Sequence, residues 1–139
     1  MDLAAALAAA RERHQGVLVT LRRDGRPQLS NIVYALDGGI ARISVTDDRA
    51  KTANLRRDPR ASLYVPGESF WSYLVLDGTA ELTPVAAAPN DATVEELVGL
   101  YRAVGGEHPD WTDFRSTMVA ERRLVARLRF DWAYGIPAG

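Results

Sequence analysis

Residues 17–36 set the architecture. They read VLVTL at Val17–Leu21, RRDGRP at Arg22–Pro27 and QLSNIVYAL at Gln28–Leu36. The outer two runs are rich in strand-forming residues, and the middle run contains Asp-Gly, a dipeptide typical of tight hairpin turns. We therefore expect an antiparallel hairpin. Asp37-Gly38-Gly39 predicts a second turn and Ile40–Val45 a third strand, so that the three strands would form an antiparallel meander.

Helices and further strands are expected around this meander. Apolar periodicity predicts helices over 2–14, 49–57, 92–104 and 110–122, and strands over 61–65, 71–82 and 124–136. Alternation in the last strand would place Phe130, Trp132, Tyr134 and Ile136 on one face, with Trp132 and Tyr134 in the core. Gly78, inside a strand, indicates a bulge or the close approach of a ligand. About six antiparallel strands with helices to the side predict an α+β fold with a closed or split antiparallel β-barrel.

Composition narrows the class of protein. The chain of 139 residues has no evident linker, which favours a single domain over 1–139. The net charge of -1 gives no electrostatic footprint for nucleic acid, and no apolar run is long enough to span a membrane. The alanine-rich start soon meets Arg11, Glu12 and Arg13, so we interpret it as a helix and not as a signal peptide. The absence of cysteine excludes disulfides and thiolate catalysis and fits a cytoplasmic protein.

Most catalytic signatures are missing. His14 and His108 are the only histidines and have no clustered carboxylates, so no metal site is expected. The chain has no Gly-x-Ser-x-Gly elbow, no phosphate-binding loop of the nucleotide hydrolase type and no dinucleotide-binding glycine motif. No side chain is assigned as catalytic. An enzyme built from this sequence would therefore depend on a cofactor for its reactive atom.

A candidate anion site lies at the start of the helix predicted over 49–57. Arg49 and Lys51, the latter the only lysine among 17 basic residues, fall in its first turn, where cations oppose the helix dipole. The same place suits a phosphate, because free backbone N–H groups point outwards, and Thr52 would add a hydroxyl donor. Alternatively, Asp47 and Asp48 pair with these cations on a solvated surface.

Two further stretches have polar or aromatic residues suited to a planar ligand. Gln28 and Ser30 share one face of their strand and Asn31 points to the other, where they can hydrogen-bond a polar ring; the alternative is an exposed strand end. Trp71 can stack on a planar ring, although an aromatic residue at such a position also fills cores and subunit contacts.

Several of these motifs together resemble a known family. The chain is similar to the pyridoxine 5′-phosphate oxidase-like superfamily of FMN-binding split barrels, and more narrowly to its deazaflavin (coenzyme F420)-dependent reductases. The resemblance spans nearly the whole chain. It rests on Gly25–Asn31, Arg49–Ser62, Trp71–Tyr73, Gly78–Ala80, Gly106–Trp111 and Tyr134-Gly135.

The resemblance implies a homodimer with two cofactor sites at the subunit interface. It implies that Arg49, Lys51 and Thr52 hold the cofactor phosphate, and that the ring-side pocket is lined by Gln28, Ser30 and Asn31. Trp71 of the second subunit would border the site. Arg122 or Arg123 would meet the acidic tail of the deazaflavin.

The function implied is an F420-dependent oxidoreductase that transfers a hydride from the reduced deazaflavin to a small organic acceptor. One alternative is an FMN-dependent oxidase of the pyridoxine 5′-phosphate type, although residues 132–139 lack the basic cluster expected for its substrate phosphate. A second alternative is a non-catalytic protein that binds a deazaflavin, a flavin or haem. Haem would require His14 or His108 as its axial ligand.

Overall fold

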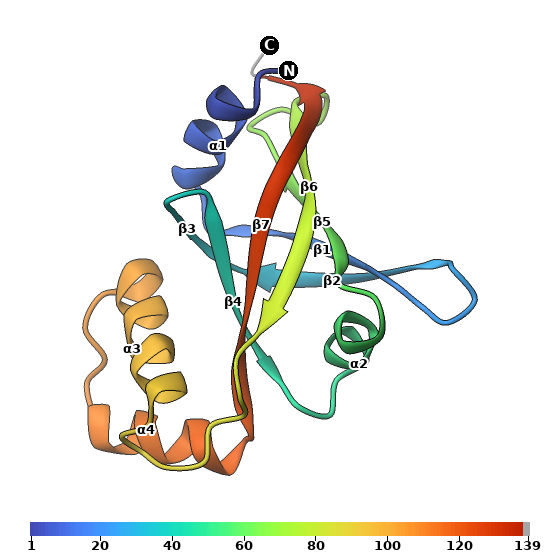
Figure 1. The fold of residues 1–139 in the computed structure, drawn as a ribbon. Coiled ribbons are helices and arrows are strands. Elements are labelled where there is room, and N and C mark those ends of the chain that lie inside the picture. Colours follow the sequence, from blue (N-terminus) through green and yellow to red (C-terminus); the bar gives the residue numbers. More distant parts are fainter. Residues whose placement is uncertain (138–139) are drawn as a thin grey trace.

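One antiparallel sheet of seven strands forms the body of the protein in the computed structural model, which describes residues 1–137 (Figure 1). Across the sheet the strand order is β2-β1-β5-β6-β7-β4-β3. Along the chain the elements are α1 (Leu3–Arg11), β1 (Gln15–Leu21), β2 (Pro27–Val33), β3 (Ala35–Asp37), β4 (Ile40–Thr46), α2 (Ala50–Arg57), β5 (Arg60–Pro66), β6 (Tyr73–Leu82), α3 (Ala92–Gly105), α4 (Trp111–Ala120) and β7 (Arg123–Ile136).

A single residue joins the two edges of this sheet. β2 ends at Val33 and β3 begins at Ala35, yet these strands occupy opposite edges. Because only Tyr34 lies between them, the sheet must curl until its edges meet at this corner. The result is an α+β fold, a split antiparallel β-barrel with flanking helices, which confirms the fold class predicted from the sequence.

The predicted three-strand meander is wrong. Residues 28–36 do not form one strand: β2 pairs with β1, and β3 pairs with β4. The chain changes direction at Tyr34, whose side chain is fully buried and whose hydroxyl donates to the carbonyl oxygen of Ala10 at 2.6 Å. The Tyr34 backbone N–H also donates to the carbonyl of His14, at 2.8 Å. These bonds hold the corner and direct the chain from one edge to the other.

A β-bulge changes which residues of β7 face the core. Asp77 opposes Trp132 and Gly78 opposes Phe130, so Asp131 has no partner on β6. An extra residue moves the following side chains to the other face. Phe130 is buried, whereas Trp132 is 63% and Tyr134 47% exposed. The expectation that these aromatic residues share one inward face is therefore wrong, while the bulge predicted at Gly78 is confirmed.

The outer face of the sheet carries exposed apolar and aromatic side chains among a few polar ones. One row of neighbouring residues crosses five strands in register and consists of Asn31, Val17, Tyr64, Val75 and Tyr134. The parallel row beside it consists of Leu29, Val19, Ser62, Asp77 and Trp132. Large apolar side chains on these rows are exposed, including Leu29 at 61%. We call these two rows the outer sheet face.

The helices pack against two separate cores. Asp2 caps α1, which buries Ala6 and Ala10 against the barrel core. α3 and α4 form a second core of their own, with the buried residues Val94, Leu97, Val98, Phe114 and Met118, among others. In Figure 1 this helical pair lies beside β4, at the end of the barrel away from α1. Within residues 1–137, no helix is long and apolar enough to cross a membrane.

Candidate functional site

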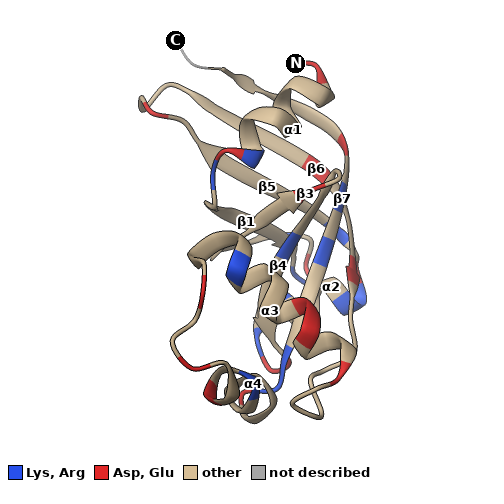
Figure 2. Ribbon diagram, turned by 90° about the vertical axis from the view of Figure 1, so that its left-hand side faces the viewer, with Lys and Arg blue, Asp and Glu red and all other residues tan. Residues whose placement is uncertain are grey.

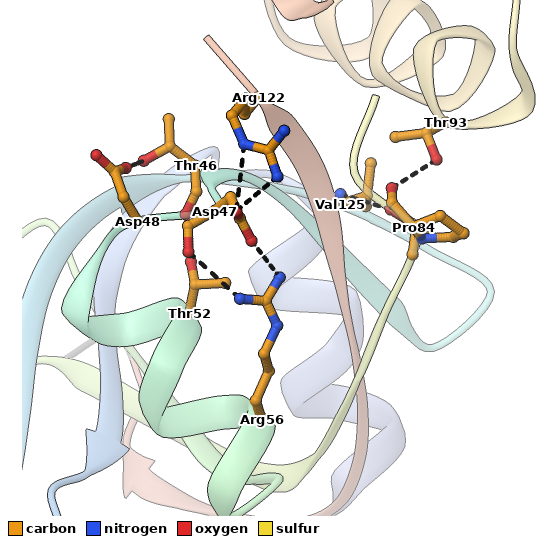
Figure 3. Close-up of polar contacts among 10 residues, drawn as sticks. Thr46, Asp47, Asp48, Thr52, Arg56, Pro84, Thr93, Arg122 and Val125 are labelled. Carbon is orange, nitrogen blue, oxygen red and sulfur yellow. Dashed lines mark hydrogen bonds and ion pairs between the residues drawn. The ribbon is translucent and has the colours of Figure 1, made fainter. Parts of the chain in front are cut away.

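Side-chain hydrogen bonds hold the corner between β4 and α2 (Figure 3). Thr46 donates its hydroxyl to Asp48 at 2.9 Å, and Thr52 donates its own to the carbonyl of Thr46 at 2.7 Å. Arg49 is the N-cap residue of α2, with extended backbone and no capping bond from its side chain. The helix N-terminus therefore has backbone N–H groups that its cap residue does not satisfy.

Asp47 neutralises two arginines at this corner. Its carboxylate accepts from Arg122 at 2.9 Å and from Arg56 at 2.6 Å, as Figure 3 shows. The hydrogen bond from Arg122, followed by that from Arg56, holds the pKa of Asp47 below its usual value. Asp47 therefore pairs with Arg56 and Arg122, and Asp48 accepts from Thr46. Neither carboxylate binds Arg49 or Lys51, the two cations that the sequence singled out. Among residues 1–137, neither Arg49 nor Lys51 forms an ion pair.

Lys51 carries its charge in an unfavourable place. It lies in the first turn of α2 and is partly buried. Burial, and then repulsion from Arg49 and Arg123, lowers the pKa of Lys51 below its usual value. A negatively charged group at this position would offset both the desolvation and the repulsion.

Lys51 lines a pocket of about 530 Å³, a volume within the usual range for small-molecule sites. The polar lining residues come from four different elements, namely Asn31 of β2, Ser44 of β4, Lys51 of α2 and Arg123 of β7. The opposite side is a wall of apolar and aromatic residues from α3 and α4: Leu97, Leu100, Tyr101, Val104, Phe114 and Met118. We call this side the α3–α4 wall. The basic residues of β4, β7 and α2 are blue in Figure 2.

The predicted site residues fall in different places. Lys51 and Asn31 line the same pocket. Arg49 lines a neighbouring hollow, together with Arg122 and Arg123. Thr52 is fully buried, and its hydroxyl donates to the backbone carbonyl of Thr46. Within this chain the residue therefore stabilises the β4–α2 corner.

The other predicted residues lie apart from this pocket. Gln28 and Ser30 lie on β2, on the face opposite to Asn31. Trp71 is 74% exposed in the loop between β5 and β6, where it packs edge-on against Phe70. That loop adjoins α1, away from α2 (Figure 1).

Sequence reasoning missed part of the pocket. Ser44 lies within an ordinary strand pattern, and nothing in the sequence distinguishes it. Arg123 was expected at an acidic tail, but it also lies beside Lys51, and its guanidinium donates to the Ser44 hydroxyl at 3.3 Å. The sequence did not identify the α3–α4 wall, because a helix that lines a pocket has the same periodicity as one that packs on a core.

The profile of the pyridoxamine 5′-phosphate oxidase family matches residues 3–136. The chain belongs to this family. The match covers every helix and strand of the barrel. It confirms the superfamily resemblance seen in the sequence.

Solved structures of the same fold are named for different groups. An F420 reductase is 23% identical, with a TM-score of 0.68 over 91% of this chain and 94% of its own. An FAD-binding protein from Mesorhizobium loti is 18% identical, with a TM-score of 0.68 over 97% of this chain and 92% of its own. A haem storage protein from Vibrio cholerae is 14% identical, with a TM-score of 0.66 over 97% of this chain and 95% of its own. At these identities the likeness is one of fold alone, so the choice of ligand has to be argued from the residues of the pocket.

Proposed function

We propose that this family member is an oxidoreductase that uses coenzyme F420 to deliver a hydride to a small organic acceptor. The observation that carries the proposal is Lys51, a partly buried cation without an ion-pair partner in residues 1–137, which lies in a pocket of about 530 Å³. Such a pocket suits a ligand with a phosphate at one end and a planar body at the other.

The residues of the pocket fit this cofactor. Lys51 would hold the phosphate, with Arg49 and Arg123 as the neighbouring cations. The amide of Asn31 would hydrogen-bond the polar edge of the ring. When bound, the reduced deazaflavin supplies a hydride, and the role of the chain is to position the acceptor and exclude water.

One cation beside the pocket favours the deazaflavin over FMN. In the adjoining hollow Arg122 pairs with Asp47 and Arg123 with Glu121, whereas Arg49 has no ion-pair partner in residues 1–137 and offers its guanidinium to an acidic tail, which FMN lacks. An FMN-dependent oxidase remains the second candidate, because the same cation at Lys51 serves either phosphate.

The placement of the histidines argues against haem in this pocket. His14 donates from Nδ1 to the carbonyl of Tyr34 at 3.0 Å. His108 accepts at Nδ1 from the backbone N–H of Asp110 at 2.9 Å and packs among aromatic rings. Neither histidine lines the pocket within the described part of the chain, so neither is in place as an axial ligand there.

We also propose that the protein works as a homodimer joined through the outer sheet face. An exposed apolar surface of this extent is unusual on a monomeric soluble protein. Asn31 lies at the end of one row of this face and also lines the pocket, so a second subunit on the face would border the cofactor. Trp71 of that subunit is the predicted contact.

The proposal is tested by titrating the protein with coenzyme F420 and, separately, with FMN, while ligand fluorescence is followed. We expect tight binding of the deazaflavin. Lys51→Ala should weaken it by about 1–3 kcal/mol, the cost of losing a hydrogen bond to a charged group, which is roughly a fivefold to 150-fold rise in Kd.

Arg26→Ala is the control, since it removes the same charge from an exposed hairpin turn. Affinity unchanged in Lys51→Ala would overturn the phosphate site. A preference for FMN would overturn the choice of cofactor and favour the oxidase.

A further inference from the structure

Four residues of the α3–α4 wall are at most 8% exposed, whereas Tyr101 and Val104 remain partly exposed beside the pocket. On α3, Leu97, Leu100, Tyr101 and Val104 recur at helical spacing along one side and face the pocket. On α4, Phe114 and Met118 lie one turn apart and face the same space. Most of this wall is packed in the second core, and at Tyr101 and Val104 it also borders a pocket of about 530 Å³.

The wall is held in a fixed shape by aromatic packing. The ring of Tyr101 packs edge-on against Phe114, with centroids 5.3 Å apart, and against Trp111 at 5.7 Å. Arg102 lies over the face of Trp111 at 4.7 Å. A preformed apolar surface loses little conformational entropy when it takes up a ligand.

The cofactor proposed above does not account for this wall. Its phosphate and acidic tail belong with the cations at Lys51, Arg49 and Arg123, because a carboxylate or phosphate pressed against apolar side chains would lose its hydration without gaining a partner. In the proposed function Asn31 of β2 holds the polar edge of the ring, which leaves the α3–α4 side of the pocket for a second group that is itself apolar.

We propose that the α3–α4 wall binds the apolar body of the acceptor. The protein would then select acceptors with an extended aliphatic or aromatic part over small polar ones. This inference rests on the proposed function, since it assigns the second ligand of the same pocket. It makes Val104 and Tyr101 residues that determine specificity.

The test compares two tryptophan variants of α3. Val104→Trp would fill the pocket from the wall, and Val104 is partly exposed, so a larger side chain is tolerated at its position. Ala103→Trp, one residue earlier on the exposed side of the helix, is the matched control. Val104→Phe fills less of the space and serves if the larger substitution impairs folding, which a thermal melt reports.

Each variant is titrated with the apolar anionic dye 1-anilinonaphthalene-8-sulfonate in the absence of cofactor, and separately with coenzyme F420. We expect Val104→Trp to weaken dye binding at least tenfold and to change the coenzyme Kd less than about twofold. Ala103→Trp should change neither, and Lys51→Ala should weaken the coenzyme far more than the dye.

The outcomes separate the inference from the proposed function. Unchanged dye binding in Val104→Trp would overturn the inference, as would an equal loss of dye and coenzyme, which would place the cofactor ring against the wall. Failure of the wild-type protein to bind the coenzyme, with dye binding still lost in Val104→Trp, would overturn the proposed function and support the wall as an apolar binding site.

Discussion

At the scale of single residues, Lys51 combines the binding role proposed for it with a cost to folding. Burial and the neighbouring Arg49 and Arg123 lower its pKa, so the folded chain holds this proton less tightly than the unfolded chain does. Between the lowered pKa and the usual value of 10.5, the unfolded state binds more protons, and stability therefore rises with pH across that window. Below the window the folded protein carries the full cost of the charge.

The affinity for an anion has the opposite dependence on pH. As the pH rises through the lowered pKa of Lys51, the ammonium group is lost, and binding of the cofactor phosphate should weaken while the fold gains stability. Lys51→Arg should keep its charge and hold affinity nearly constant. Kd measured by fluorescence at intervals from pH 7 to 10 checks this. Equal pH profiles for the wild type and Lys51→Arg would show that Lys51 does not carry the interaction.

At the scale of elements, α2 is held on the barrel by a buried polar network. Asn54 donates to the hydroxyl of Thr20 at 3.1 Å and accepts from Arg57 at 2.9 Å. Arg57 also donates to the carbonyl of Leu21 at 2.7 Å. Thr20 is fully buried, so its hydroxyl has no access to water in place of Asn54. The network fixes the helix that presents Lys51.

Asn54→Ala should therefore cost about 1–3 kcal/mol of unfolding free energy, the penalty for leaving a buried polar group unpaired. Chemical denaturation measures the loss, and cofactor affinity should fall with it because α2 loosens. Asn90→Ala, at an exposed loop position, should change stability by less than about 0.5 kcal/mol. Similar losses in the two variants would mean that the network does not anchor α2.

Alanine should have opposite effects on stability at two glycines, Gly78 in the bulge between β6 and β7 and Gly99 on α3. A Cβ at Gly78 would lie 1.8 Å from the carbonyl oxygen of Arg129, and the strand would have to move. Gly78→Ala should destabilise the fold by about 1–3 kcal/mol or more. Gly99→Ala, on the exposed side of α3 where a Cβ meets nothing, should stabilise it by about 0.4–1 kcal/mol. Thermal unfolding of both variants checks the pair, and a tolerated Gly78→Ala would contradict the packing described.

At the scale of the whole molecule, the outer sheet face predicts the state of association. We expect light scattering to give a mass near twice 15.2 kDa. Trp132→Asp replaces an exposed aromatic side chain of the outer sheet face by a charge and should yield monomers with weakened cofactor binding, because one side of each site is lost. Ala103→Asp, which adds the same charge on α3, should remain dimeric. A monomeric wild type would remove the proposed interface.

Local patterns in the sequence were sufficient for the strands and helices but not for their partners. The hairpin at Asp24-Gly25 was predicted from its turn residues and is present. It could be predicted because a hairpin turn depends on residues that are neighbours in the chain. The break at Tyr34 and the reversal of Trp132 depend on hydrogen bonds and registers across distant segments, so periodicity did not predict them.

The candidate site was predicted to a similar degree. The unusual cations at the start of α2 were sufficient to locate Lys51, and Asn31 on β2 proved to line the same pocket. The α3–α4 wall was not predicted, because the sequence does not state what an apolar stripe faces. Whether a second chain brings Trp71 to the site also depends on a contact that one sequence cannot define.

The join at Tyr34 also bears on how the protein avoids aggregation. Edge strands of open sheets have unpaired backbone groups that recruit strands from other molecules. Here the two edge strands are consecutive in the chain and tied at a buried corner, so neither can separate far enough at that end to offer a long template. Loosening the corner, for example by removing the hydroxyl that binds Ala10, would expose both edges at once. The residue that closes the barrel thus also protects it from fibril-like self-association.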